Sequence, residues 1–252
     1  MTPLSTIAVP RAFFGENFTA SLIDDLMRQG WAYAPQALDP DLITALRADA
    51  LHLIAEGEVK AAAIGRGDLE QRAPQIRKTS IAWMDGASQA QRDFLEGCEA
   101  MRLSINRALF AGLFEFEAHY AHYPLGGFYK RHLDAFSGPA QTGGPSAMFG
   151  PRAGRSRIVS CVVYLNDNWR DEEGGQLALW QECPLTIDNT PDLDALNDYP
   201  PSQLISPKAG GLVLMMSEQI PHEVYPSTRD RLAIAGWWRV NASIGGRIDP
   251  GR

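Results

Sequence analysis

The sequence predicts a mainly β protein, built as an antiparallel sandwich or barrel with helices before it. From residue 114 onward, short segments rich in β-branched and aromatic residues are separated by Gly, Pro and Asp turns, which is typical of antiparallel strands. Before residue 114, apolar residues recur instead at helical spacing. We therefore expect N-terminal helices that pack on a β core and support it.

Three helices are expected in the N-terminal part, over 18–28, from Asp39-Pro40 onward, and over 89–110. The second has a clear start, because an acidic N-cap followed by Pro is favoured at the first turn of a helix. Each segment carries an apolar stripe at helical spacing, such as Leu22 and Leu26 in the first. These stripes are the surfaces expected to face the sheet.

Strands and loops account for the remaining segments. Short strands are expected over 31–38 and 79–85, ahead of the core. The core strands are expected at 114–123, 157–167, 174–180, 210–217, 222–226 and 231–238. Two segments between core strands, 137–155 and 182–202, are rich in Gly, Pro or acidic residues and are expected to form surface loops. Residues 57–78 form a long polar connection, and such a loop inside a compact domain is often functional.

Composition excludes several classes of function. The 252 residues carry 23 Lys+Arg and 30 Asp+Glu, a net charge of −7, which disfavours a protein that works by binding nucleic acid. The longest apolar run, 212–216, is too short to span a membrane, and the N-terminus lacks a secretory signal pattern. Three isolated cysteines form no CxxC pair, which favours a reducing compartment. We expect a cytoplasmic protein with neither nucleic acid nor membrane partners.

Two histidines and a carboxylate form the candidate chemical site. Residues i and i+2 of a strand point to the same face, so His132 and Asp134 would lie side by side. His222 follows a very apolar strand far along the sequence. Two His and one acid are the ligands of the facial triad that binds Fe(II) and leaves open positions, with Zn as the competing metal. Arg231 begins another apolar strand and requires an anionic partner, for which its fork geometry favours a carboxylate.

These residues occur in an order that resembles the Fe(II)- and 2-oxoglutarate-dependent oxygenases, and most closely the prolyl 4-hydroxylase branch, the bacterial relatives of the oxygen-sensing prolyl hydroxylases. The matching strings cover most of the chain: IRKTSIAWMDG, YPLGGFYKRHLD, VVYLNDNW, GGQLALW, PHEVYP and RLAIAGWW. The resemblance implies a double-stranded β-helix (jelly-roll) core over 114–241. It implies one catalytic domain over 1–252, in which 1–113 form the helical support and 57–78 a candidate lid that closes over a substrate.

The resemblance also implies the cofactors and the reaction. His132, Asp134 and His222 would hold Fe(II). The co-substrate 2-oxoglutarate would chelate the metal and pair its far carboxylate with Arg231. O2 would take the remaining position, and ascorbate is a further expected cofactor. The reaction would hydroxylate a prolyl residue of a protein at its 4-position and release succinate and CO2, with elongation factor Tu as a candidate substrate.

Further pocket residues follow from the same resemblance. Tyr164 would donate a hydrogen bond to the 2-oxoglutarate carboxylate, and Tyr123 and Trp237 would line its pocket. His119 shares strand parity with Tyr123 and is a further candidate, with a hydrogen-bonded strand histidine as the alternative. Arg229 competes with Arg231 for the carboxylate, and Arg231 is preferred because it opens the apolar strand.

Two other functions remain open at this point. The same chemistry could act on a free amino acid, a peptide or another small molecule, and the longer loops at 137–155 and 182–202 keep this alternative in place. A metal-binding jelly roll without catalysis, used for sensing or interaction, is the second alternative. The pairing of Arg231 with Tyr164 argues against it, since a bare metal site needs no carboxylate clamp.

Overall fold

The computed structural model describes residues 16–62, 75–135, 157–187 and 191–240. The helices are α1 (Glu16–Gln29), α2 (Pro40–Ala55) and α3 (Gln89–Leu109), close to the predicted spans. Asp39 caps α2 by accepting a hydrogen bond from the Asp41 N–H at 2.9 Å, as its place before Pro40 predicted. Ser88 caps α3 in the same way, through the Gln91 N–H at 3.0 Å.

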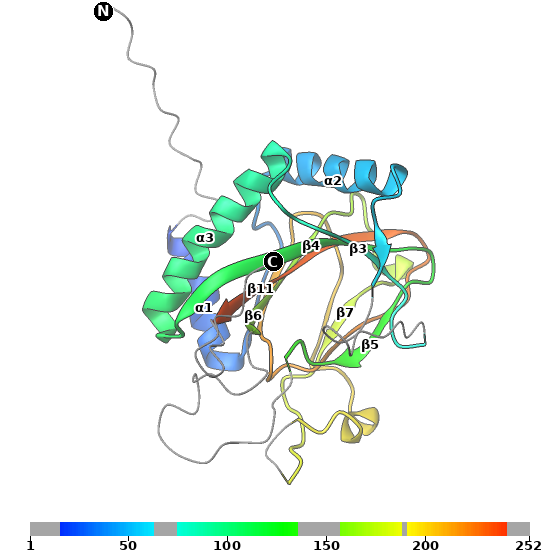
Figure 1. Ribbon diagram of the computed structural model, residues 1–252. Helices are drawn as coiled ribbons and strands as arrows, with labels where there is room; N and C mark the ends of the chain where they lie inside the picture. The colour runs from blue at the N-terminus through cyan, green and yellow to red at the C-terminus, as the bar shows by residue number, and fades with distance from the viewer. Residues whose placement is uncertain (1–15, 63–74, 136–156, 188–190, 241–252) are drawn as a thin grey trace, which may run out of the picture.

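The larger sheet is antiparallel and has the strand order β1-β9-β6-β11-β4-β3-β2. Its strands are β1 (Trp31–Ala34), β9 (Leu212–Met216), β6 (Arg157–Tyr164), β11 (Arg231–Val240), β4 (Leu113–Tyr123), β3 (Ser80–Trp83) and β2 (Lys60–Ala61). The long strands β4 and β11 pair along their whole length and cross the molecule together (Figure 1). They place the functional residues of one strand opposite those of the other.

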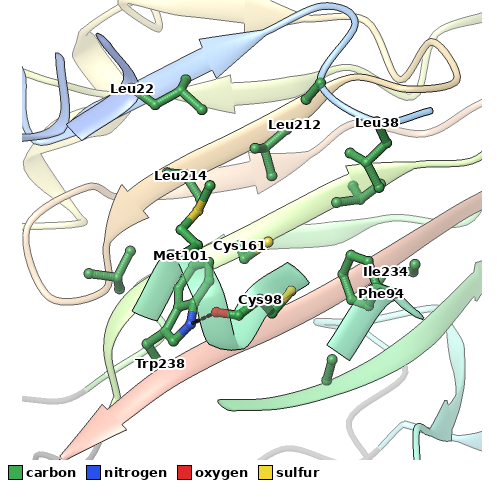
Figure 2. Packing of buried hydrophobic residues seen from close by; sticks show 14 of the residues in the cluster. Leu22, Leu38, Phe94, Cys98, Met101, Cys161, Leu212, Leu214, Ile234 and Trp238 are labelled. Atoms are coloured by element: carbon green, nitrogen blue, oxygen red, sulfur yellow. Dashed lines mark hydrogen bonds between the residues drawn. The ribbon is translucent and has the colours of Figure 1, made fainter. Parts of the chain in front are cut away.

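The helices cover one face of this sheet (Figure 1). Side chains alternate between the two faces of β11, so Ile234 and Trp238 point toward the helices and belong to the larger hydrophobic core. Figure 2 shows Trp238 beside Cys98 and Met101 of α3, with its indole N–H donating to the Cys98 carbonyl at 3.0 Å. Cys98 is therefore a buried core residue with a free thiol.

The smaller sheet lies against the opposite face. Its strands follow the order β5-β10-β7-β8, with bounds Tyr129–His132, His222–Val224, Leu177–Leu179 and Gln203–Ile205. A second apolar cluster, which includes Ala233, Val213 and Leu179, fills the space between the sheets. The two packed antiparallel sheets confirm the double-stranded β-helix that the family resemblance implied.

The loops differ from the expectation in one respect. The segment 182–202, expected as a surface loop, contains a short 3-10 helix at Ala195–Asp198. Its Leu196 is fully buried against Trp180 and Ala178 on the outside of the smaller sheet. The segment 137–155 and most of the candidate lid, 63–74, lie outside the described residues. In the parts of the chain that the structure describes, no helix is both long and apolar enough to cross a bilayer.

Candidate active site

The three predicted ligands converge at one end of the smaller sheet. His132 ends β5 and lies directly opposite His222, the first residue of β10, in the antiparallel register. Asp134 brings a carboxylate oxygen within 3.6 Å of the Nε2 atom of each histidine. One ligand atom from each residue lies within 4.8 Å of the others, so a single metal ion can be held by all three.

Asp134 reaches this position differently from the prediction. His132 and Asp134 were expected on one continuous strand, but β5 ends at His132 and Asp134 lies in the following bend. Its backbone N–H donates to the Ser217 carbonyl at 3.1 Å, which ties the bend to the end of β9. The strand interpretation was wrong for Asp134, although the side-by-side placement of the two side chains is correct.

Hydrogen bonds to carbonyl groups fix which histidine nitrogens are free. The Nδ1 atom of His132 lies 2.7 Å from the Lys130 carbonyl, and that of His222 lies 3.0 Å from the Ile220 carbonyl. A carbonyl oxygen only accepts hydrogen bonds, so both Nδ1 atoms carry the proton when the rings are neutral. Both Nε2 lone pairs then point toward Asp134, which is the arrangement that a metal ion requires.

The charges of the three groups favour a cation at neutral pH. Burial lowers the pKa of His222 to about 4, with the neighbouring His132 acting in the same direction, so His222 is an unprotonated ligand at pH 7. Burial opposes ionisation of Asp134, but the nearby His222 and His132 hold the pKa of its carboxyl well below the usual range. An ionised carboxylate beside two imidazole lone pairs is a donor set that fits Fe(II).

Arg231 is buried near this site without an internal anion. It is 1 % exposed, and its Nε–H donates to the Gly175 carbonyl at 3.0 Å. Its guanidinium lies over the Tyr123 ring at 4.7 Å and near the Tyr164 ring at 5.3 Å. Among the described residues, no carboxylate lies within ion-pair distance of it. A buried cation of this kind is costly unless a ligand supplies the negative charge.

Tyr164, like Arg231, is a buried polar residue that needs a partner. Its hydroxyl is buried and has no hydrogen-bond partner among the described residues. Burial raises the pKa of Tyr164 although the Arg231 charge opposes the shift, so the hydroxyl keeps its proton and remains a donor. Buried polar groups are normally satisfied, and this one needs an acceptor at the position that Arg231 also faces. The pair therefore fits the carboxylate of a bound 2-oxoglutarate.

Arg229 does not share these properties. Its guanidinium approaches the Glu173 carboxylate at 3.4 Å, and it stacks over Trp169 at 4.9 Å. Its side chain is also more exposed, at 37 %. The structure therefore favours Arg231 over Arg229 as the carboxylate-binding residue.

Trp237 and His119 lie further along the same face of the larger sheet. Trp237 is six positions beyond Arg231, a separation of about 20 Å along an extended strand. Arg157 stacks on its indole at 3.6 Å, and His119 lies beside it at 5.4 Å between ring centroids. Trp237 thus lies beyond the Arg231 pocket, and its place in 2-oxoglutarate binding remains a prediction.

Sequence reasoning missed a second arginine at the site. The ring of Tyr129 stacks on His132, with centroids 3.5 Å apart, and the Arg77 guanidinium lies over Tyr129 at 4.5 Å. A β-bulge between β5 and β10 brings Tyr129 and His132 together, although strand alternation alone places them on opposite faces. Arg77 occurs in the matching string IRKTSIAWMDG, but nothing in that string indicates a ring stack with a residue of β5.

Comparison with known proteins identifies the family. The sequence model of the 2OG-Fe(II) oxygenase superfamily matches residues 118–239. No curated protein matches the chain. A crystal structure of a Pseudomonas putida prolyl-4-hydroxylase is 35 % identical, with 88 % of this chain and 98 % of that chain covered at a TM-score of 0.68.

More distant structures share the fold. A prolyl hydroxylase in complex with a hypoxia inducible factor peptide fragment, from Trichoplax adhaerens, is 23 % identical over 88 % of this chain and 89 % of that chain, with a TM-score of 0.67. A prolyl 4-hydroxylase from Phytophthora capsici is 17 % identical over 87 % of this chain and 62 % of that chain, with a TM-score of 0.60.

The fold, the ligand set and these matches lead to one assignment. The chain belongs to the 2OG-Fe(II) oxygenase superfamily, in its prolyl hydroxylase branch. It is a 2-oxoglutarate-dependent dioxygenase, and its cofactors are Fe(II), 2-oxoglutarate and O2.

Proposed function

We propose that this enzyme hydroxylates the 4-position of a prolyl residue in a protein and releases succinate and CO2. The observation that carries the proposal is that one fold contains both a candidate metal site and a candidate carboxylate-binding site. Two Nε2 atoms and a carboxylate converge on a single point, and a buried arginine and tyrosine lack an anion nearby. This pairing also argues against a metal-binding sensor, which would not need the second site.

Each residue has a distinct part in the proposed reaction. His132, Asp134 and His222 would hold Fe(II), and the carbonyl-bonded Nδ1 atoms keep both imidazoles oriented with Nε2 toward the metal. The bound metal and 2-oxoglutarate supply the oxidising chemistry. Arg231 and Tyr164 would bind the far carboxylate of the co-substrate, and the apolar cluster around Ala233 and Val213 excludes water from it.

The aromatic residues beyond the triad suit a prolyl substrate. Trp83 is 45 % exposed, and its ring meets His119 edge-on with centroids 5.1 Å apart. His119 in turn contacts Trp237, so three rings line the same face of the larger sheet. A pyrrolidine ring is a compact apolar group that packs well on such rings. The Trichoplax adhaerens relative holds a peptide fragment, which supports a peptide or protein as the substrate of this enzyme also.

The most direct experiment is a proteome comparison. Proteins from a strain that lacks this enzyme are compared by mass spectrometry with those of the parent strain. A proline that carries one additional oxygen atom should be present only in the parent and return when the gene is restored. Elongation factor Tu is the first candidate to inspect, and this choice follows from the family resemblance.

A biochemical control separates catalysis from binding. The purified enzyme with Fe(II) should convert 2-oxoglutarate to succinate, and the His132→Ala and His222→Ala variants should not. If both variants retain full conversion, the ligand assignment fails. If the wild type oxidises only free amino acids or other small molecules and the proteome is unchanged, the alternative substrate class replaces the protein substrate.

A further inference from the structure

Arg77 holds a positive charge one aromatic ring, that of Tyr129, away from the metal ligand His132. The His132 ring covers one face of Tyr129 at 3.5 Å, so the Arg77 guanidinium, 4.5 Å from the ring centre, lies over the other face. The Arg77 backbone also pairs with Tyr129, in an antiparallel bridge flanked by hydrogen bonds from Lys78 and Lys130 N–H groups. Arg77 is thereby held against β5 by both its main chain and its side chain.

The electrostatic reach of Arg77 extends across the site. Burial lowers the pKa of His119 to about 3, and the Arg77 charge contributes to that shift. Burial raises the pKa of Tyr129 to about 12, and the same charge opposes that shift. The Arg77 charge thus acts on His119 of the larger sheet as well as on Tyr129 of the smaller one, which its guanidinium covers. The stack on Tyr129 therefore places this charge beside the metal ligand His132.

Arg77 differs from two other arginines of the protein, Arg157 and Arg239, each of which is paired with an acid. Arg157 donates two hydrogen bonds to the Glu117 carboxylate, at 2.9 and 3.0 Å. Arg239 pairs with Glu115 at 2.9 Å and with Glu117 at 3.0 Å. Among the described residues, no carboxylate lies within ion-pair distance of Arg77, and its buried Nε–H has no acceptor. In a chain of net charge −7, an arginine beside a metal ligand with no acid paired to it in the described part of the chain is a specific feature.

We propose that Arg77 binds a carboxylate of the substrate, and that the enzyme selects a prolyl residue with an Asp or Glu within three positions of it. This inference rests on the proposed prolyl hydroxylation. The unpaired guanidinium offers a forked set of donors that matches a carboxylate. The distance limit follows from the ring stack. Its two spacings, 4.5 Å from Arg77 to Tyr129 and 3.5 Å from Tyr129 to His132, are spanned by one to three residues of extended peptide at about 3.3–3.6 Å each.

The test uses the Fe(II)-loaded enzyme with 2-oxoglutarate and a series of short peptides. Each peptide has one central Pro among Ala and Gly, with a single Asp placed from three positions before the Pro to three positions after it. Matched peptides carry Asn in place of Asp. Binding is measured without oxygen by fluorescence anisotropy, and KM and kcat are measured in air by mass spectrometry of the hydroxylated peptide.

At least one Asp position should give about tenfold tighter binding than its Asn match in the wild type, as expected for a charge-assisted hydrogen bond. Arg77→Gln should remove this preference by raising KM for the Asp peptide about tenfold with little change in kcat, because the contact is equal in ground and transition states. Arg77→Lys should retain part of the preference. Arg77→Glu should instead favour peptides with Lys at the same position.

Controls separate this inference from the proposed function. Arg28→Gln makes the same change in charge on the exposed face of α1, where Arg28 pairs with Asp25, and should leave the Asp preference unchanged. Succinate formation without peptide reports the metal and co-substrate sites.

Equal binding of every Asp and Asn pair by the wild type overturns the inference, a result that requires no variant to fold. If the wild type forms succinate but hydroxylates none of the peptides, the proposed prolyl function is overturned instead. Free proline, which carries its own carboxylate, serves as a separate arm for a small-molecule substrate, and its preference over all peptides also contradicts the inference.

Discussion

His119 makes the stability of this protein depend on pH in a predictable way. The imidazole is 2 % exposed, between the Trp83 and Trp237 rings, and its Nδ1 atom lies 3.1 Å from the Tyr120 carbonyl. Burial lowers the pKa of His119 from 6.5 to about 3, and the nearby Arg77 and Arg157 charges act in the same direction. The folded protein therefore keeps His119 neutral at pH values where the unfolded chain protonates it.

The sign and size of the effect follow from this difference. Because the pKa of His119 is lower in the folded protein, its contribution to the free energy of unfolding is fully present above pH 6.5. This contribution is lost as the pH falls toward 3. Between pH 7.5 and pH 5, the unfolded chain gains protonation over about 1.5 pH units, which lowers the free energy of unfolding by about 2 kcal/mol. A stability change of this size is a large fraction of the total for an ordinary domain.

The assay compares urea unfolding of the wild type and the His119→Asn variant at both pH values, with a chelator present to remove metal. Asparagine can still donate to the Tyr120 carbonyl but does not titrate. Between pH 7.5 and pH 5, the free energy of unfolding should fall by about 2 kcal/mol more for the wild type than for the variant. A His52→Asn control makes the same substitution at an exposed position of α2 and measures the effect of the exchange itself. Equal losses in the wild type and His119→Asn would refute a buried neutral His119.

Three further predictions concern the site and its support. Tyr164→Phe should leave the stability of the ligand-free protein unchanged or slightly higher, because it removes an unsatisfied hydroxyl, but should weaken 2-oxoglutarate binding about tenfold by calorimetry. His222→Ala should abolish binding of Mn(II), measured by electron paramagnetic resonance, while circular dichroism remains that of the wild type. Gly236→Ala should cost about 1–3 kcal/mol in urea unfolding, because a Cβ there meets the Phe116 ring, and Phe116→Ala should recover part of this loss.

Much of the fold follows from local patterns in the sequence. The apolar alternation of 231–238 predicts which side chains of β11 face the helices and which face the site, and Trp238 and Arg231 occupy those two faces. The N-termini of α2 and α3 follow from the N-cap residues Asp39 and Ser88, because capping depends on neighbours only a few residues away. The ligand set was also predictable, since the order of the motifs indicates the family.

The remaining features depend on contacts between distant segments. A bulge opposite β10 places Tyr129 on the His132 side of the sheet, and no pattern within 129–132 indicates where the register shifts. Asp134 depends on the Ser217 carbonyl, more than eighty residues later in the sequence. The ring stack under Arg77 joins an early bridge to β5. Such features decide which charges are balanced, and they do not show in any local pattern because each joins segments far apart in the sequence.

The balance of charge also predicts how the co-substrate affects stability. Arg231 is buried without a carboxylate among the described residues, so it destabilises the ligand-free fold, and a bound 2-oxoglutarate should remove that cost. With Zn(II) in place of iron to prevent turnover, 2-oxoglutarate at about 100 times its Kd should stabilise the wild type by about 2.7 kcal/mol. Arg231→Met keeps the volume but not the charge, and should raise the melting temperature of the ligand-free protein while removing the shift caused by 2-oxoglutarate. Arg229→Met, two positions earlier in the sequence and paired with Glu173, should retain the shift. If Arg231→Met keeps the shift and Arg229→Met loses it, the carboxylate binds to Arg229 and the argument from burial is wrong.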